Sequence, residues 1–265
     1  MRRYSFAHLA VPAAVVLATV GVFAQAATTQ KPKPFEPTVG QAGKDVVWVP
    51  TPQALVDKML DMAKVTPQDV VIDLGSGDGR TVITAAKRGA RASGIEYNPD
   101  MVELSKKNAA AAGVKANFVK ADLFETDLSS ATVITMFLLP DINLKLRPKI
   151  LDLEPGTRIV SNSFTMDDWE PDQTERIEED CTSWCTALLW YVPAKVDGTW
   201  KLGNDTLTLT QKFQMISGML GSAPISNGRL KGDEITFTAG GTNYVGKVNG
   251  KTMTGTAPKA WTATR

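Results

Sequence analysis

The sequence predicts an α/β protein with a doubly wound, mostly parallel sheet, followed by a C-terminal antiparallel β meander or small barrel. From residue 46, strand-length apolar runs alternate with helix-length segments, the pattern of a parallel sheet with helices on both faces. After Pro193, short alternating segments separated by hairpin turns take over. A glycine-rich turn directly after the first apolar run is the third observation, because such turns bind ligands at the edge of these sheets.

The N-terminal residues are typical of an export leader that ends at Ala26. Arg2 and Arg3 form a charged start, residues 9–24 are almost wholly apolar, and Ala24-Gln25-Ala26 matches the small-x-small cleavage signal. The alternative is an uncleaved membrane anchor, although the apolar core is short for a span of roughly 20 residues. In either case the body of the chain is expected to be exported, as a periplasmic or secreted protein.

Loss of the leader removes the sole histidine, His8. Residues 27–265 then carry 27 Lys and Arg against 28 Asp and Glu. Because no imidazole remains, Ser-His-Asp and Cys-His catalysis and His-rich zinc sites are excluded. A net charge of −1 offers no global field for nucleic acid. The sequence therefore predicts chemistry by carboxylates, amides and backbone groups, with no metal and no nucleic-acid partner.

Changes in composition divide the chain into four regions. They are a signal peptide over 1–26, a flexible linker over 27–45, an α/β domain over 46–194 and an antiparallel β domain over 195–265. The α/β domain opens with a helix at Thr51-Pro52, since proline suits the first helical turn. Strands are then expected at 70–74, 92–96, 114–119, 131–137 and 157–163, and helices at 80–88, 99–112 and 142–153.

Two further groups of strands complete the prediction. Segments at 174–179 and 187–192 have no helix between them, so they are expected to add antiparallel strands at one edge of the sheet. In the last region, alternating segments are separated by the turn sequences Gly232-Asp233 and Asn249-Gly250. These features predict consecutive antiparallel hairpins.

The strongest chemical signal is the run from Asp73 to Arg80, in which Gly75, Gly77 and Gly79 follow a buried strand and open a helix. Glycines let the backbone approach a ligand, and the helix N-terminus presents free N–H groups. The run is neither a Walker motif nor the G-x-G-x-x-G dinucleotide fingerprint. The Asp73 carboxylate would repel a pyrophosphate but suits a cationic ligand.

Two more acids stand at the ends of the next strands. Glu96 can accept hydrogen bonds from both hydroxyls of a ribose, and Asp122 can accept from the exocyclic amine of an adenine. Because the carboxyl ends of parallel strands meet at one edge of a sheet, these acids are expected to converge with Asp73.

This combination resembles the class I, seven-stranded S-adenosylmethionine-dependent methyltransferases. The sequences VPTPQALVDKMLDMAKV, VVIDLGSGDGRTVITAAKRG, GIEYNP and LEPGTRIVSNSF, within residues 46–194, resemble the mitochondrial protein-lysine methyltransferases and their bacterial relatives. The resemblance implies a Rossmann-like fold with S-adenosyl-L-methionine as cofactor. The cofactor-binding residues that it implies are Asp73, Gly75, Ser76, Gly77, Gly79, Glu96, Tyr97, Asn98, Asp122 and Leu123. Known targets of the family, the adenine nucleotide translocase and the ATP synthase c-subunit, imply a lysine on a membrane-associated protein as acceptor.

The methyl acceptor is less sharply indicated. Residues 136–140, Met-Phe-Leu-Leu-Pro, stand where many amide- and adenine-methylating members carry Asn/Asp-Pro-Pro-Tyr/Phe, which argues against those substrates. The segment either walls an acceptor channel or is a strand that runs into a buried turn. Without histidine, an amine is favoured, because it can lose its proton to solvent or to a carboxylate. No catalytic residue is assigned.

Residues 167–180 contain eight acids and one base, around Trp169. They are expected either to attract a lysine-bearing substrate, with Trp169 at the entrance, or to form a solvated face. Cys181 and Cys185 are four residues apart. They cannot be bridged within a strand but can be in a turn or loop, so a disulfide and two free thiols both stay open.

The sequence therefore predicts an exported S-adenosylmethionine-dependent methyltransferase that N-methylates an amine such as a protein lysine. Two alternatives stay open. One is methylation of a small molecule. The other is a non-catalytic binding protein on the same scaffold, which would explain why a leader directs the chain away from the cytosol, where the cofactor is made.

Overall fold

The computed structural model describes residues 1–3 and 35–265. Apart from its first three residues, the predicted leader lies outside the described residues, as does the predicted linker up to residue 34. Export therefore stays a prediction. Among the described residues, no helix combines the length and the apolar character that crossing a membrane requires.

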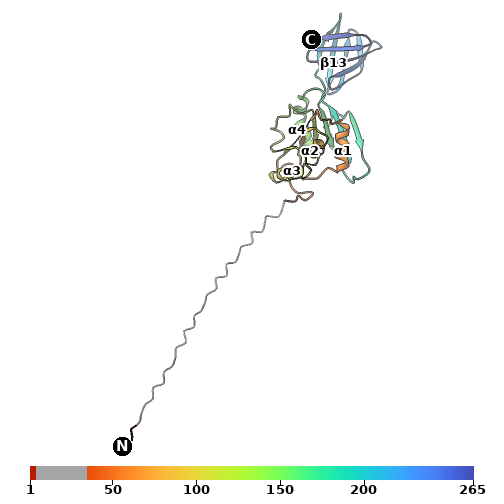
Figure 1. Cartoon of the computed structure of the whole chain (residues 1–265). Helices are drawn as coiled ribbons and strands as arrows, with labels where there is room; N and C mark the ends of the chain where they lie inside the picture. Colours follow the sequence, from red (N-terminus) through yellow and green to blue (C-terminus); the bar gives the residue numbers. More distant parts are fainter. Residues whose placement is uncertain (4–34) are drawn as a thin grey trace. The chain divides into compact units, whose positions relative to one another are not determined.

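The first part of the described chain forms a seven-stranded sheet (Figure 1). Its strands are β1 (Val70–Leu74), β2 (Arg91–Glu96), β3 (Asn117–Lys120), β4 (Val133–Met136), β5 (Arg158–Asn162), β6 (Gln173–Arg176) and β7 (Thr186–Tyr191). They lie in the order β3-β2-β1-β4-β5-β7-β6, in which β3 to β5 pair in parallel and β7 pairs antiparallel with both of its neighbours. The predicted doubly wound sheet with an antiparallel edge is confirmed.

Helices cover both faces of this sheet. They are α1 (Gln53–Met62), α2 (Arg80–Lys87), α3 (Pro99–Ala111) and α4 (Pro140–Leu151). Because successive residues of a strand point to opposite faces, Val71 packs in a core with α1, α2 and α3, whereas Ile72 packs in a second core with α4. The central strands β1, β4 and β5 are buried on both faces, whereas β3 and β6 at the two edges are largely exposed.

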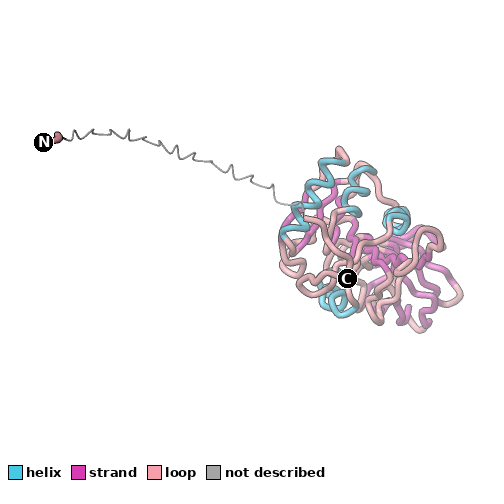
Figure 2. Tube along the Cα trace, turned by 90° about the horizontal axis from the view of Figure 1, so that it is seen from below, coloured by secondary structure: helices cyan, strands magenta, loops and turns pink. Residues whose placement is uncertain are grey.

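The C-terminal part is a closed antiparallel barrel. Its strands are β8 (Gly198–Leu202), β9 (Asp205–Lys212), β10 (Met215–Leu220), β11 (Ala223–Lys231), β12 (Glu234–Ala239), β13 (Thr242–Asn249), β14 (Thr252–Ala257) and β15 (Trp261–Thr264). Each strand pairs with the next, and β15 closes on β8. Strand β9 shows the principle: Leu207 and Leu209 are buried, whereas Thr206 and Thr208 are exposed. Figure 2 shows the barrel as the helix-free part of the chain.

Candidate functional site

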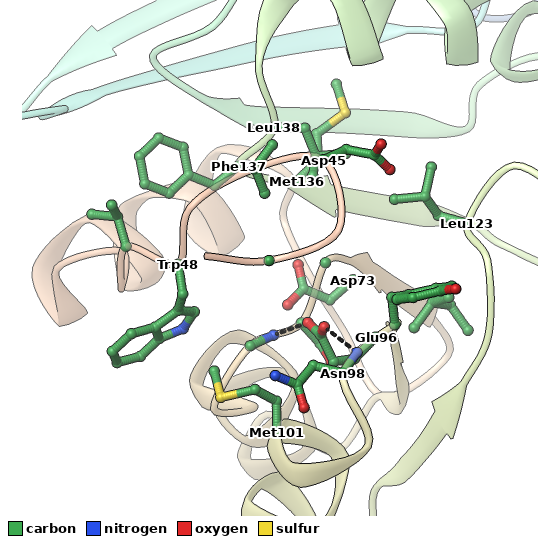
Figure 3. A pocket seen from close by; sticks show the side chains of 18 of the residues that line it. Asp45, Trp48, Asp73, Glu96, Asn98, Met101, Leu123, Met136, Phe137 and Leu138 are labelled. Carbon is green, nitrogen blue, oxygen red and sulfur yellow. Dashed lines mark hydrogen bonds between the residues drawn. The ribbon is translucent and has the colours of Figure 1, made fainter. Parts of the chain in front are cut away.

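A cleft in the described part of the chain lies at the carboxyl edge of the sheet (Figure 3). The ends of β1, β2 and β4 and the loop after β3 line it, as the sequence predicts for the three acids. Residues 41–51, which we call the N-terminal strap, line it as well. Of the ten predicted cofactor residues, all but Gly79 line this cleft.

The glycine-rich turn folds back on the neighbouring strand β2. The amides of Gly75 and Ser76 both donate to the Ile95 carbonyl, at 2.9 and 3.1 Å. Gly75 and Gly77 have φ values of 74° and 53°, in the left-handed region that favours glycine. A Cβ on Gly77 would lie 2.6 Å from the Trp48 indole nitrogen, so the strap packs directly on the bare backbone.

Gly79 has a structural role at the back of the turn. It precedes α2 as its N-cap with a φ of 83°. A Cβ there would meet the Phe118 ring and the Ser105 side chain at 2.8 to 2.9 Å. Gly79 therefore lets the turn pack closely against α3 and β3, which explains a glycine that does not line the cleft.

Asp73 is a buried carboxyl at the end of β1. Its side chain is 6% exposed and accepts a hydrogen bond from the Thr135 hydroxyl at 2.6 Å. Burial raises the pKa of Asp73 to about 7, opposed by the Thr135 hydrogen bond and assisted by the nearby carboxylates of Glu96 and Asp78. A cationic partner would stabilise the ionised form of this buried carboxyl.

The Glu96 carboxylate, at the end of β2, binds backbone amides of two segments, the glycine-rich turn and the start of the β2–α3 connection. It accepts hydrogen bonds from the Gly77 amide at 3.0 Å and the Asn98 amide at 2.9 Å (Figure 3). Asn98 in turn caps α3 by accepting from the Asp100 amide. These bonds tie the glycine-rich turn to the β2–α3 connection, so that the carboxylate has a fixed place in the cleft.

Asp122, after β3, is paired with a residue that no sequence motif indicates. The Lys44 ammonium of the strap lies 2.6 Å from its carboxylate and 4.7 Å from the centre of the Tyr97 ring. The Lys44 hydrogen bond, together with one from the Phe124 amide, lowers the pKa of Asp122. Lys44 thus occupies the acid that we expect to bind the adenine amine.

The side of the cleft that follows β4 is apolar and aromatic. Phe137, Leu138 and Leu139 follow β4 and line the cleft, so this segment walls it. The Phe137 ring stacks on Phe164 at 5.7 Å between centroids and meets Trp184 edge-on at 5.9 Å. No sequence pattern singles out Phe164 or Trp184, because their meeting depends on the order of β4, β5 and β7 in the sheet.

The acidic run 167–180 divides into two parts. Asp168 pairs with Arg147 and with Lys212 of the barrel, whereas Asp172, whose side chain is 6% exposed, pairs with Arg229 of the barrel. The acids at 178–180 form no ion pair with any described residue and belong to the loop that carries Trp184. These three acids line a separate shallow hollow with Ala54 and Ile177.

Trp169 does not stand at the entrance. It is fully buried, contacts Trp190 and stacks on Phe213 of the barrel at 5.7 Å between centroids. The hypothesis that it lines the acceptor path is therefore wrong, because the β9–β10 hairpin covers it.

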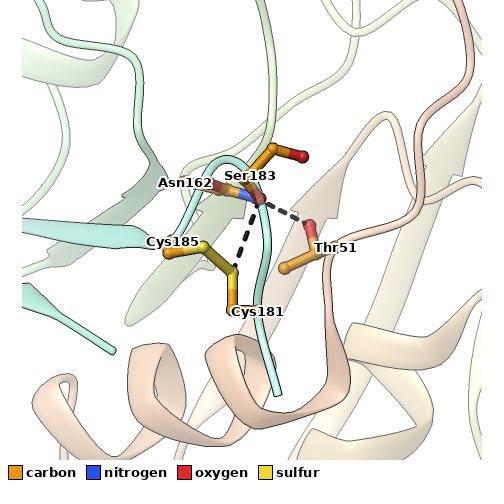
Figure 4. The surroundings of a disulfide bond; sticks show 5 residues. All are labelled: Thr51, Asn162, Cys181, Ser183 and Cys185. Atoms are coloured by element: carbon orange, nitrogen blue, oxygen red, sulfur yellow. Dashed lines mark hydrogen bonds between the residues drawn. A yellow bond between two sulfur atoms is a disulfide. The ribbon is translucent and has the colours of Figure 1, made fainter. Parts of the chain in front are cut away.

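Cys181 and Cys185 form a disulfide, which the sequence left open (Figure 4). Their Cα atoms lie 5.8 Å apart, because the segment between β6 and β7 is an irregular loop. The loop runs beside the Thr51–Asn162 contact, in which the Asn162 amide donates to the Thr51 hydroxyl at 3.3 Å.

Known proteins are similar to this part of the chain. A family described as the ANTKMT methyltransferase domain matches residues 73–173. A protein-lysine N-methyltransferase of Saccharolobus islandicus (strain REY15A) is 45% identical over 139 residues, which cover 51% of this chain and 86% of that protein. The adenine nucleotide translocase lysine N-methyltransferase of Mus musculus is 36% identical over 120 residues, which cover 44% of this chain and 52% of that protein. The match thus spans about half of the mouse protein.

A solved structure is also similar. It is a Salinibacter ruber chain described as an RNA methyltransferase in complex with S-adenosyl-L-homocysteine, with 49% identity and a TM-score of 0.53, covering 56% of this chain and 96% of that one. The strand order and the glycine-rich cleft define the class of the molecule, an S-adenosylmethionine-dependent methyltransferase. The resemblance, the fold and the cofactor predicted from the sequence are confirmed. The chain belongs to the methyltransferase family of the Saccharolobus protein.

Proposed function

We propose that this enzyme N-methylates an amine, with a protein lysine as the acceptor, and that it does so outside the cytosol. The observation that carries the acceptor class is the aromatic wall of Phe137, Phe164 and Trp184, which lines the cleft. Trp184 belongs to the loop that also carries the acidic residues 178–180. The names of the Saccharolobus and mouse relatives point to the same acceptor.

The cleft fits the cofactor. The Ser76 hydroxyl is buried and has no hydrogen-bond partner among the described residues, and Gly75 and Gly77 line the cleft without a side chain that would fill it. When bound, S-adenosylmethionine supplies a methyl group on a positively charged sulfur. We assign Asp73 to hold the cationic amino group, Glu96 the ribose hydroxyls and Asp122 the adenine amine. The last contact requires the Lys44 pair to open.

The residues of this chain contribute alignment more than acid–base chemistry. Methyl transfer is an in-line displacement, so holding the acceptor nitrogen and the donor at a fixed geometry provides much of the acceleration. Residues 27–265 contain no histidine. The proton of an ammonium acceptor therefore passes to solvent or to a carboxylate before the displacement.

RNA is the second candidate acceptor, because of the description of the Salinibacter chain. The charge of the α/β domain argues against an RNA acceptor. Residues 46–194 carry 22 acids and 15 bases, and the loop next to the aromatic wall is acidic. Binding to RNA depends on neutralising phosphates with Lys and Arg, which this surface balance disfavours.

The test supplies the purified full chain with S-adenosylmethionine labelled in its methyl group and with three acceptor pools: envelope proteins, total RNA and a small-molecule extract. We expect label in protein, recovered as methyl-lysine after hydrolysis. Label confined to RNA or to a metabolite would replace the lysine proposal with one of its rivals. Calorimetry with S-adenosylhomocysteine should show binding that Glu96→Ala weakens. Absence of heat at millimolar ligand would instead favour a non-catalytic module.

Export rests on the leader pattern, and the Cys181–Cys185 disulfide supports it, since disulfides persist in oxidising compartments. N-terminal sequencing of the protein from fractionated cells tests it. We expect a chain that begins at Ala27 in the periplasmic or secreted fraction. A chain that begins at Met1 in the membrane fraction would mean a retained anchor, and one in the cytosol would refute export.

A further inference from the structure

Three aromatic side chains meet on the side of the cleft that follows β4 and β5. Phe137 follows β4, Phe164 follows β5 and Trp184 lies in the loop between β6 and β7. All three line the cleft, and Trp184 is 44% exposed. Exposure of an indole over an open cleft leaves its face available to a ligand.

Separate contacts hold two of these rings in place. The Phe164 carbonyl accepts from the Ser161 hydroxyl at 2.7 Å and from the Asn143 amide at 3.3 Å, which fixes the turn after β5. Trp184 has a φ of 53° and lies within the segment that the Cys181–Cys185 disulfide closes. Figure 4 shows this disulfide with Ser183. The disulfide restricts the conformations of this loop, in which the indole meets the Phe137 ring.

The loop that carries Trp184 is acidic, which suits a cation. Glu178, Glu179 and Asp180 precede Cys181 in the same loop, and Arg176 is the one base between residues 167 and 180. An ammonium group is attracted by the faces of aromatic rings as well as by carboxylates, and its aliphatic stem packs on apolar side chains. The arrangement therefore combines an apolar wall with aromatic faces in the cleft, and the loop that carries Trp184 adds negative charge to that part of the chain.

We propose that Phe137, Phe164 and Trp184 form the subsite for the ammonium-bearing side chain of the acceptor, and that the Cys181–Cys185 disulfide positions Trp184 in it. The proposal rests on the proposed function, because it takes an amine as the acceptor. Trp184 acts on acceptor affinity, and the disulfide acts through Trp184. Reduction of the disulfide should therefore weaken acceptor binding and leave cofactor binding unchanged.

The probes are three peptides of one sequence, with a central lysine, trimethyl-lysine or norleucine flanked by serine and glycine. With the lysine peptide as substrate, Trp184→Ala should raise KM by about 3- to 30-fold, the range expected for a cation over an aromatic ring. The kcat at saturation should stay within about twofold, and Trp184→Phe should recover most of the affinity. Val245→Ala, at a barrel residue that is 46% exposed, is the matched control and should change nothing.

The double variant Cys181→Ser/Cys185→Ser tests the positioning step. It should raise KM for the lysine peptide as reductant does in the wild type, and reductant should have no further effect on it. The Kd of S-adenosylhomocysteine, measured by calorimetry, should be the same in all these proteins. An unchanged KM in Trp184→Ala, or a Kd for S-adenosylhomocysteine that rises in parallel with KM, would overturn the subsite.

Binding experiments separate this proposal from the proposed function. If the wild type methylates no lysine, the proposed function fails, and direct titration with the trimethyl-lysine peptide still tests the subsite. If the trimethyl-lysine peptide binds to the wild type, and if binding is lost both for the norleucine peptide and in Trp184→Ala, the result would support a cation subsite that serves another amine. Absence of binding by the trimethyl-lysine peptide would then overturn both proposals.

Discussion

Replacement of Asp73 by asparagine isolates the charge of a single buried carboxyl. Asparagine keeps the oxygen that accepts from the Thr135 hydroxyl and has nearly the same shape. It has no proton to lose between pH 4 and 8. The variant therefore removes the electrostatic cost of the site with little change in packing.

The sign and size of the effect follow from the pKa of Asp73. Burial raises it from 3.8 to about 7 in the folded protein, so the folded chain holds a proton that the unfolded chain has released. The contribution to stability is fully present below about pH 4 and is lost as pH rises to about 7. At about 1.4 kcal/mol per pH unit, the wild type loses about 4 kcal/mol over this interval.

Urea unfolding of the ligand-free proteins at several pH values provides the assay. The free energy of unfolding of Asp73→Asn, relative to the wild type, should rise by about 4 kcal/mol between about pH 4 and pH 8. The control is Glu154→Gln, an exposed acid, whose difference from the wild type should stay nearly constant. Parallel curves for Asp73→Asn and the wild type would refute a buried carboxyl with a raised pKa.

The same substitution should stabilise the ligand-free protein at neutral pH but weaken its affinity for the cofactor. A cationic amino group favours the ionised Asp73, so wild-type affinity for S-adenosylhomocysteine should fall by up to about tenfold per pH unit below pH 7. Asp73→Asn should bind weakly at every pH and lose this dependence. Calorimetry checks both, and equal affinities of the two proteins at about pH 8 would remove Asp73 from the cofactor site.

Three other substitutions, one of them with a matched control, test separate parts of the molecule. Lys44→Ala should tighten binding of S-adenosylhomocysteine about two- to fivefold in calorimetry, because Asp122 is released from an exposed ion pair; weaker binding would mean that Lys44 itself is a ligand. Gly77→Ala should weaken that binding by more than about tenfold, because its Cβ would press on the strap. Gly113→Ala is the control for backbone strain, because φ is 68° there and no atom lies within 4 Å. It should lower the free energy of unfolding in urea by about 1–2 kcal/mol and leave the affinity for S-adenosylhomocysteine unchanged. An equal loss of affinity in Gly113→Ala would mean that strain, and not contact with the strap, explains the Gly77→Ala result. Phe213→Ala should lower the free energy of unfolding by about 2 kcal/mol in urea, since its ring covers a buried tryptophan; a value near zero would show that the hairpin contact adds nothing.

Local patterns predicted most elements of the fold because those elements are locally determined. The apolar run 70–74 became β1 with the same ends, and the Asn-Gly turn at 249–250 joins β13 to β14. Where tertiary contacts determine the end of an element, its predicted boundary differs from the observed one. Strand β3 begins at Asn117 and not at 114, because the Val114 amide completes the end of α3 by donating to the Ala109 carbonyl.

The site was predicted unevenly for the same reason. The strand-end acids could be predicted, since a parallel sheet brings its carboxyl ends to one edge. Lys44 could not, because a segment rich in proline, lysine and glycine has no local signal for lying over Asp122 and Tyr97. Trp169 was misplaced because its environment is created by Phe213, which is far away in the sequence.

The near-neutral composition of the chain conceals a division of charge that links these findings. Residues 46–194 have seven more acids than bases, whereas residues 195–265 have nine bases and four acids. Asp168 and Asp172 use part of the acidic excess to bind Lys212 and Arg229 of the barrel. Since Asp172 is almost fully buried, this part of the run serves the fold, as a buried acid is tolerated only when it is paired. The acids at 178–180 form no such pair with the described residues, and they directly precede the disulfide-closed segment that carries Trp184. A chain that used its whole acidic run to attract an acceptor would leave the barrel without these partners.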